Sequence, residues 1–104
     1  MAFRVLSRVA DGFMTVDEAV VPPVMRRLAL PVAGDPPVVA GESGCAGLAG
    51  VIALLRDDPA TAARIGLGPG ARVLVVNTEG ATDPALYRGI TGLDPATVAE
   101  GAAA

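Results

Sequence analysis

Two kinds of hydrophobic pattern alternate along this chain of 104 residues. In the first kind, apolar residues recur every three or four positions, which is typical of a helix with one buried face. Residues 2–10 (AFRVLSRVA) have this pattern, and Gly12 is placed to end the helix. Residues 17–28 have it too, with Asp17 as the predicted N-cap. A Pro-Pro pair would interrupt that helix, so we expect a late start with Pro22 in the first turn.

The helical pattern predicts three further helices. Ser43 is the predicted N-cap of GCAGLAGVIALLRDD, the strongest helical segment. Pro59 opens a short helix, PATAARIG, and Asp83-Pro84 begins the last helix, because proline is tolerated at the first helical position. We expect one domain over residues 1–92 and a flexible tail over residues 93–104.

The second kind of pattern predicts strands. Residues 13–16 (FMTV) form a short β-prone run, and residues 37–41 (PVVAG) form a short buried strand. Residues 72–78 (RVLVVNT) are almost continuously apolar up to the end of the predicted strand, which is typical of a strand covered on both faces. Strands that alternate with helices predict an α/β fold, with a partial parallel sheet and flanking helices.

Composition and charge exclude some classes of function and partner. The formal net charge is −3, His is absent, and all eight basic residues are Arg. Without a basic cluster the chain is a poor match for nucleic acid. The longest apolar stretch, CAGLAGVIALL, is shorter than the roughly 20 residues of a membrane span. The single cysteine excludes an internal disulfide and fits a reducing compartment. We therefore expect a cytoplasmic protein without nucleic-acid or membrane partners.

Two functional motifs are excluded, namely the nucleophile elbow of ester hydrolases and the P-loop of nucleotide-binding proteins. The stretch GESGCAG at 41–47 departs from the nucleophile elbow G-x-S-x-G at Cys45. Without His, no Ser-His-Asp relay can be built from this chain. No Gly-Lys-Ser/Thr follows the glycines, so the segment is not a P-loop. Cys45 is expected to be a small buried hydrophobic residue, because no basic residue stands beside it in sequence.

Polar turns follow two of the predicted strands. Glu42 lies in the turn 41–44, where the simplest interpretation is a solvated carboxylate near a helix start. Asn77, Thr78 and Glu79 follow the apolar strand, where turn chemistry and ligand binding are equally good interpretations by position alone. Two such turns at one edge of a sheet would converge, and this favours a pocket between 41–44 and 77–80. Gly47 and Gly50 are expected to serve helix packing.

Three segments carry a resemblance to a known family. GESGCAGLAGVIALL and RVLVVNTEGATDPALYRGITG resemble the C-terminal part of the diaminopropionate ammonia-lyases, and ADGFMTVDEAVVPPVMRRLA resembles the segment before them. These are pyridoxal-phosphate enzymes of the tryptophan synthase β type (fold type II). The resemblance covers nearly all of residues 2–92, and NTEGATDP is its most specific part.

The resemblance implies a cofactor site. In the family, the pyridoxal ring lies against the C-terminal ends of strands, and a lysine from the N-terminal part forms a Schiff base with its aldehyde. A polar residue at the end of a late strand faces the ring nitrogen, which corresponds to Asn77 or Thr78. A carboxylate before a glycine-rich helix lies near the ring, which corresponds to Glu42. The implied reaction is elimination of ammonia from the amino acid 2,3-diaminopropionate, giving pyruvate.

The chain also departs from the family. It contains no lysine, so it cannot form the Schiff base alone, and the family's phosphate-binding loop and acid/base residues lie upstream. Met1 stands inside a recognisable helix. We therefore expect a truncated reading frame, a gene remnant or one part of a split enzyme, inactive alone, with a complementing N-terminal chain or a second copy as partner. The alternative is a non-catalytic α/β interaction module.

Overall fold

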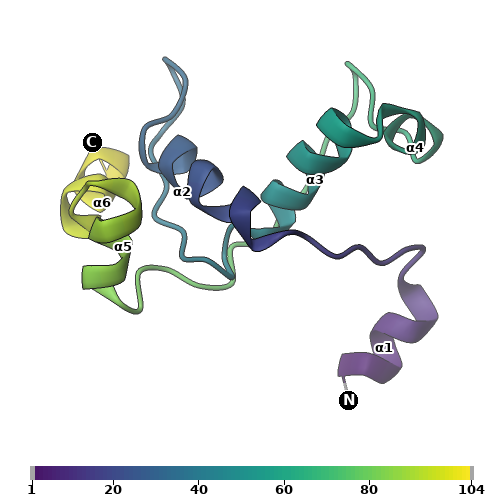
Figure 1. The fold of residues 1–104 in the computed structure, drawn as a ribbon, viewed down its shortest axis with the longest axis horizontal. Coiled ribbons are helices and arrows are strands. Elements are labelled where there is room, and N and C mark those ends of the chain that lie inside the picture. Colours follow the sequence, from purple (N-terminus) through teal and green to yellow (C-terminus); the bar gives the residue numbers. More distant parts are fainter. Residues whose placement is uncertain (1, 104) are drawn as a thin grey trace.

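A computed structural model describes residues 2–103, and the side chains as far as residue 101. Met1, which the sequence places inside a helix, lies outside that range. The described chain folds into six α-helices and one 3-10 helix (Figure 1). They are α1 (Ala2–Val9), η1 (Glu18–Val20), α2 (Val21–Ala29), α3 (Ala46–Asp57), α4 (Pro59–Arg64), α5 (Pro84–Thr91) and α6 (Pro95–Ala103).

The predicted α/β fold with a parallel sheet is wrong for this chain. Between residues 2 and 103 the structure contains no strand, and the segments 13–16, 37–41 and 72–78 are irregular or extended without a ladder. A strand is stable only when a neighbouring strand accepts and donates its backbone hydrogen bonds. The described part of the chain supplies no such neighbour for 72–76, so the apolar pattern is present and the sheet is not.

Most helix signals are confirmed. Asp17 caps η1 by accepting a 2.9 Å hydrogen bond from the backbone nitrogen of Ala19. The proline pair occupies the first turn of α2, which is the late start that the sequence predicts. Asp83 caps α5, where its carboxylate accepts from the backbone nitrogen of Leu86 at 3.1 Å. The tail expected after residue 93 contains a helix, α6, whose Val98 is buried in the core.

Ser43 is not the N-cap of α3. That helix begins at Ala46, and its N-cap, Cys45, makes no side-chain capping bond. The backbone nitrogen of Ser43 instead donates to the carboxylate of Glu79. Residues 42–45 form a turn of their own, which the sequence pattern had merged with the helix.

The core lies between α2, α5 and α6, with the start of α3 against it (Figure 1). Met25 and Tyr87 are among its largest fully buried side chains, and most other members are Ala, Val or Cys. Arg26 reaches from α2 to the end of α5, where it donates to the carbonyl oxygen of Ile90 at 3.0 Å. This bond joins α2 to α5 in addition to their apolar packing.

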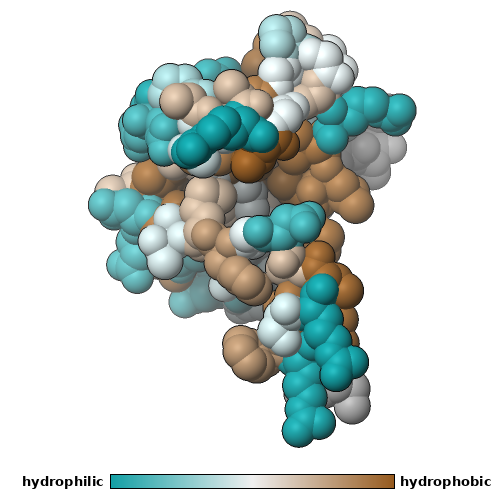
Figure 2. Space-filling view, turned by 90° about the vertical axis from the view of Figure 1, so that its right-hand side faces the viewer, coloured by the Kyte–Doolittle hydropathy of each residue, from teal (hydrophilic) through white to brown (hydrophobic). Residues whose placement is uncertain are grey.

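The chain is less compact than its length allows. Its radius of gyration is 15.0 Å, whereas a compact domain of this length has roughly 13 Å. Its accessible surface is 7379 Å², whereas about 5,400 Å² is usual for a monomer of 10.3 kDa. The helix α1 stands apart on an extended arm (Figure 1), and hydrophobic atoms reach the surface on the face that carries α1 and α4 (Figure 2).

Candidate functional site

The two polar turns, 41–44 and 77–80, lie against each other. The backbone nitrogen of Gly41 donates to the backbone oxygen of Glu79 at 2.8 Å. The backbone nitrogen of Ser43 donates to Oε1 of Glu79 at 3.3 Å. The two turns therefore converge as the sequence predicts, although no sheet brings them together.

Gly41 and Gly44 make this approach possible. A Cβ on Gly41 would collide with the backbone oxygen of Gly80, and one on Gly44 would collide with Oδ1 of Asn77 and the backbone oxygen of Glu79. Only glycine lets two backbones come this close. The glycines at 41 and 44 thus serve the contact between the turns.

The other two glycines of the series serve packing in α3, which is the interpretation preferred from sequence. A Cβ on Gly47 would meet a methyl carbon of Val75 at 3.7 Å, an ordinary contact. A Cβ on Gly50 would meet the terminal carbon of Met14 at 2.7 Å. Both glycines therefore face apolar side chains rather than the polar turns.

Glu79 is at the centre of the contact; the sequence groups it with Asn77 and Thr78 in the turn, but the predicted cofactor-binding residues do not include it. Its Oε1 accepts from the nitrogen of Ser43, and its Oε2 accepts from the hydroxyl of Thr82 at 3.1 Å. The side chain is half-buried. The available signal was the spacing of Glu79 and Thr82, a carboxylate three residues before a hydroxyl in a glycine-containing turn, which is typical of local side-chain bonding.

A cavity of about 60 Å³ lies beside the two turns, under α5 and α2. Glu42, Glu79 and Asp83 are among its lining residues, together with the buried residues Met25 and Tyr87. Glu42 itself is exposed. This predicted site residue is thus at the rim of the cavity.

Asn77 and Thr78 are exposed and do not line that cavity. The side-chain nitrogen of Asn77 donates to the backbone oxygen of Val39 at 3.0 Å, so its amide holds the turn to the segment before Gly41. The hydroxyl of Thr78 makes no hydrogen bond within the described residues, and it is free to bind. The structure thus brings Glu42 and the 77–80 turn together, but leaves Asn77 and Thr78 outside the hollow.

Two buried groups with altered acidity lie close to the site. Burial raises the pKa of the Cys45 thiol, and the nearby carboxylate of Glu42 raises it further. The expectation of a buried cysteine is confirmed. Burial also raises the pKa of Tyr87, whose hydroxyl has no hydrogen-bond partner among the residues that the structure describes. Both groups remain neutral at physiological pH, so neither supplies charge to the site.

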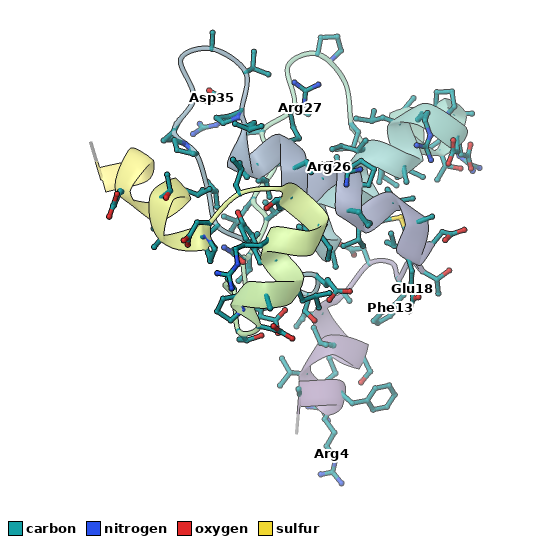
Figure 3. All side chains as sticks on the ribbon, turned by 60° about the vertical axis from the view of Figure 1, so that its left-hand side comes forward. Arg4, Phe13, Glu18, Arg26, Arg27 and Asp35 are labelled. Atoms are coloured by element: carbon teal, nitrogen blue, oxygen red, sulfur yellow. The ribbon has the colours of Figure 1, made fainter. Side chains whose placement is uncertain are left out.

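A larger hollow lies elsewhere. It is an open groove of about 930 Å³ between the arm 11–16 and helices α3 and α4. Phe13 and Met14 line it from the arm, Leu54 lines it from α3, and Ile65 lines it from the residue after α4. Figure 3 shows Phe13 on the arm near α1. Within residues 2–103, no cluster of His, Cys, Asp or Glu is arranged to hold a metal ion, and no helix is long and apolar enough to cross a bilayer.

Comparison with known proteins places the chain beside a class of carbon–nitrogen lyases, the ammonia-lyases. In particular, it is 35% identical over 91 residues to diaminopropionate ammonia-lyase of Escherichia coli strain K12, and equally similar to the enzymes of strains O6:H1 and O157:H7. Each match covers 85% of this chain and 23% of the relative. No family model and no solved structure matches.

The resemblance found in the sequence is therefore confirmed: the chain is a homologue of diaminopropionate ammonia-lyase over the matched residues. It spans about a quarter of the length of these curated relatives, which is consistent with a C-terminal segment.

Proposed function

We propose that this chain is the C-terminal part of a pyridoxal-phosphate-dependent ammonia-lyase that acts on 2,3-diaminopropionate. The observation that carries the proposal is the contact between the turns GESG and NTEG, which are distant in sequence and are the most specific parts of the resemblance. Glu42, Asn77 and Thr78 would then form the wall on the ring side of the cofactor site.

The residues present fit one wall of such a site. The cavity at the turns, about 60 Å³, is smaller than the roughly 150 Å³ of an engineered cavity that accepts benzene. The chain also contains no lysine to anchor the cofactor covalently. By contrast, the hydroxyl of Thr78 and the carboxylate of Glu42 are exposed and make no hydrogen bond within the described residues. They are available to groups that another part of the enzyme brings against them.

The chemistry divides between cofactor and protein. Pyridoxal phosphate, when bound, supplies the electron sink for breaking a bond to the amino acid's α-carbon. The residues of this chain would orient the ring. A neutral hydroxyl or amide at Thr78 or Asn77 offers the ring nitrogen a hydrogen bond without a charge, which favours a weakly protonated ring. The cofactor-anchoring lysine and the phosphate-binding loop would come from the polypeptide that the relatives have outside the matched segment.

A chimera tests this function. The 91-residue matched segment of the Escherichia coli K12 lyase is replaced by the corresponding residues of this chain, and pyruvate and ammonia are measured with 2,3-diaminopropionate. We expect a folded, cofactor-containing chimera that releases both products. Thr78→Val and Glu42→Gln should each lower kcat by about tenfold, the scale of one lost hydrogen bond. Thr15→Val and Glu18→Gln, exposed residues that do not line the cavity at the turns, are the matched controls.

The outcome also addresses the alternative of a non-catalytic interaction module. The exposed apolar residues of 73–76 favour that alternative, because they suit a partner surface as well as a missing part of an enzyme. A folded chimera that binds pyridoxal phosphate but releases no ammonia would support the module. Equal losses in the site variants and their controls would contradict the assigned residues.

A further inference from the structure

Helix α1 has an apolar side that is open to solvent. At 3.6 residues per turn, its four large apolar side chains fall on one side of the helix. These are Phe3, Val5, Leu6 and Val9, with exposed fractions of 49% to 77%. Arg4, Ser7 and Arg8 occupy the opposite side, and Figure 3 shows Arg4 pointing away from the rest of the molecule. A helix with such a division between its sides normally packs its apolar side against another surface.

The groove beside the arm 11–16 is a second open apolar surface. Met14 holds the arm against α3, because a Cβ on Gly50 would lie 2.7 Å from its terminal carbon. Most residues that line the groove are apolar, and Asp11 is the one charged residue among the lining residues that the structure describes. A pocket for a small polar molecule usually carries several converging polar groups. This groove suits the apolar side of a helix better.

Charge and area allow α1 of one copy to lie in the groove of another. The charged residues of α1 are Arg4 and Arg8, so neither meets a like charge among the residues that line the groove. The accessible surface of the chain exceeds that of a compact protein of its mass by about 2,000 Å². A stable interface of standard size buries about 800 Å² of each partner. The excess is therefore sufficient for a dimer.

The chain's own α1 has little room to turn back into the groove. Helical hydrogen bonding extends to Ala10, whose backbone nitrogen donates to the oxygen of Leu6 at 2.9 Å. Phe13 already lines the groove. Only Asp11 and Gly12 lie between, whereas a tight turn takes about four residues. A second copy's α1 needs no such reversal, because exchange leaves the arm extended as Figure 1 shows it.

We propose that two copies of this chain form a symmetric dimer in which each α1 lies with its apolar side in the groove of the other copy. Phe3 and Leu6, three residues apart on that side, are the anchors, as in other helices bound in grooves. Exchange in both directions gives a closed two-fold interface. The dimer is independent of the proposed function, because neither α1 nor the groove includes a residue of the two polar turns.

Two matched substitutions test the apolar side of α1. Leu6→Asp and Ser7→Asp add the same charge at adjacent exposed positions, on the apolar and the polar side respectively. Neither position belongs to the core, so both variants should keep the helical circular dichroism of the parent chain. In sedimentation, we expect the full chain to dimerise with a Kd of about 10 µM or tighter. Leu6→Asp should raise this Kd by about tenfold or more, because each dimer would bury two charges, and Ser7→Asp should change it by less than about threefold.

A second matched pair tests the groove. Ile65 and Leu30 are both C-cap residues of helices, and their exposed fractions are 64% and 62%. Ile65 lines the groove, and Leu30 does not. We expect Ile65→Asp to raise the Kd of the dimer by about tenfold or more, and Leu30→Asp to change it by less than about threefold.

Photocrosslinking shows which copy supplies α1. Benzoylphenylalanine replaces Phe3 in an equimolar mixture of isotope-labelled and unlabelled chains, which is then irradiated. We expect crosslinks from α1 to peptides that contain Met14, Leu54 or Ile65. About half of these crosslinks should join a labelled to an unlabelled chain, because the exchanged copies pair at random.

The proposal fails if the parent chain remains monomeric up to about 100 µM. It also fails if Ile65→Asp dimerises as tightly as Leu30→Asp, because α1 would then bind a surface other than the groove. Crosslinks confined to single chains would assign the groove to the α1 of the same molecule and exclude exchange.

Discussion

The backbone nitrogen of Gly41 donates a 2.8 Å hydrogen bond to the backbone oxygen of Glu79. This bond joins the turn before α3 to the turn before α5, and the carboxylate of Glu79 adds a second bond to Ser43. The relative position of the two turns thus depends on close backbone approach and on one carboxylate. Both features can be altered by single substitutions.

Gly44→Ala should destabilise the chain by about 1–3 kcal/mol, the usual cost of overpacking. The added Cβ would collide with the backbone of Glu79, which cannot move without breaking the contact between the turns. Gly47→Ala is the matched control, because its Cβ has room beside Val75. Alanine in place of a helical glycine should stabilise the chain by up to about 1 kcal/mol. Urea unfolding measures both, and equal stabilities would contradict the assigned contact.

Glu79→Ala removes the acceptor for the Ser43 nitrogen and the Thr82 hydroxyl. Hydrogen bonds to a charged acceptor contribute about 1.5–3 kcal/mol when buried and less when solvated. Because Glu79 is half-buried, we expect a loss of about 1–2 kcal/mol in the free energy of unfolding. Glu100→Ala, at an exposed position of α6, should change it by less than about 0.5 kcal/mol. Indistinguishable effects would show that Glu79 does not hold the turns together.

The sequence predicts these turns and most helices because both depend on local chemistry. Asp17, Asp83 and the proline in the first turn of α2 act within a few residues of their own positions. Whether a sheet forms could not be predicted in the same way. Residues 72–76 have the pattern of a buried strand, but a strand forms only if a second segment lies beside it. The sequence predicts what the segment is suited to, and not whether its partner is present.

The candidate site shows the same division. Glu42 reaches the cavity because its turn is locally defined. The convergence of the two turns was predicted from their place after expected strands, but in the structure it arises without a sheet. Glu79 was placed in the turn but not assigned its role, because its two bonds span both a local and a distant partner, Thr82 and Ser43. Asn77 was assigned to a ligand, whereas in this structure its amide binds the oxygen of Val39. Single polar residues at a turn do not reveal which partner they bind.

Asp83→Ala should destabilise the chain by about 1 kcal/mol, the typical cost of losing an N-cap. The carboxylate of Asp83 accepts from Leu86, and α5 packs on α2 in the core, so loss of the cap affects global stability. Asp83→Asn should retain most of the stability of the parent chain, because asparagine caps a helix nearly as well as aspartate. Asp35→Ala is the control, since that exposed side chain makes no hydrogen bond among the described residues. A loss in the Asp35 variant as large as that in Asp83→Ala would argue against capping.

Cys45 should react slowly in the native chain. Its thiol is buried, and burial followed by the Glu42 carboxylate raises its pKa, so little thiolate forms at neutral pH. We expect iodoacetamide to label the native chain at least about 100-fold more slowly than the urea-unfolded chain at pH 8, because reaction requires opening of the core. Rapid native labelling would show that Cys45 is accessible. Such a result would also contradict the placement of Cys45 in the core beside α2.

Tyr87→Phe should leave the chain at least as stable at neutral pH, and up to about 1 kcal/mol more stable, because it removes a buried hydroxyl that has no partner in the described structure. Tyr87→Ala should instead cost about 3–5 kcal/mol through the cavity it leaves.

The tyrosine also predicts a pH dependence. Burial raises the pKa of Tyr87 above its value of 10.0 in the unfolded chain, so its contribution to stability is complete below pH 10 and is lost as pH rises through the folded pKa. Cys45, whose pKa is also raised, begins the same loss near pH 9.0. In a Cys45→Ala background, urea unfolding between pH 9 and 11 should therefore show a decline in stability that Tyr87→Phe removes. A decline of equal slope with phenylalanine at this position would mean that the hydroxyl ionises as freely in the folded chain as in the unfolded one.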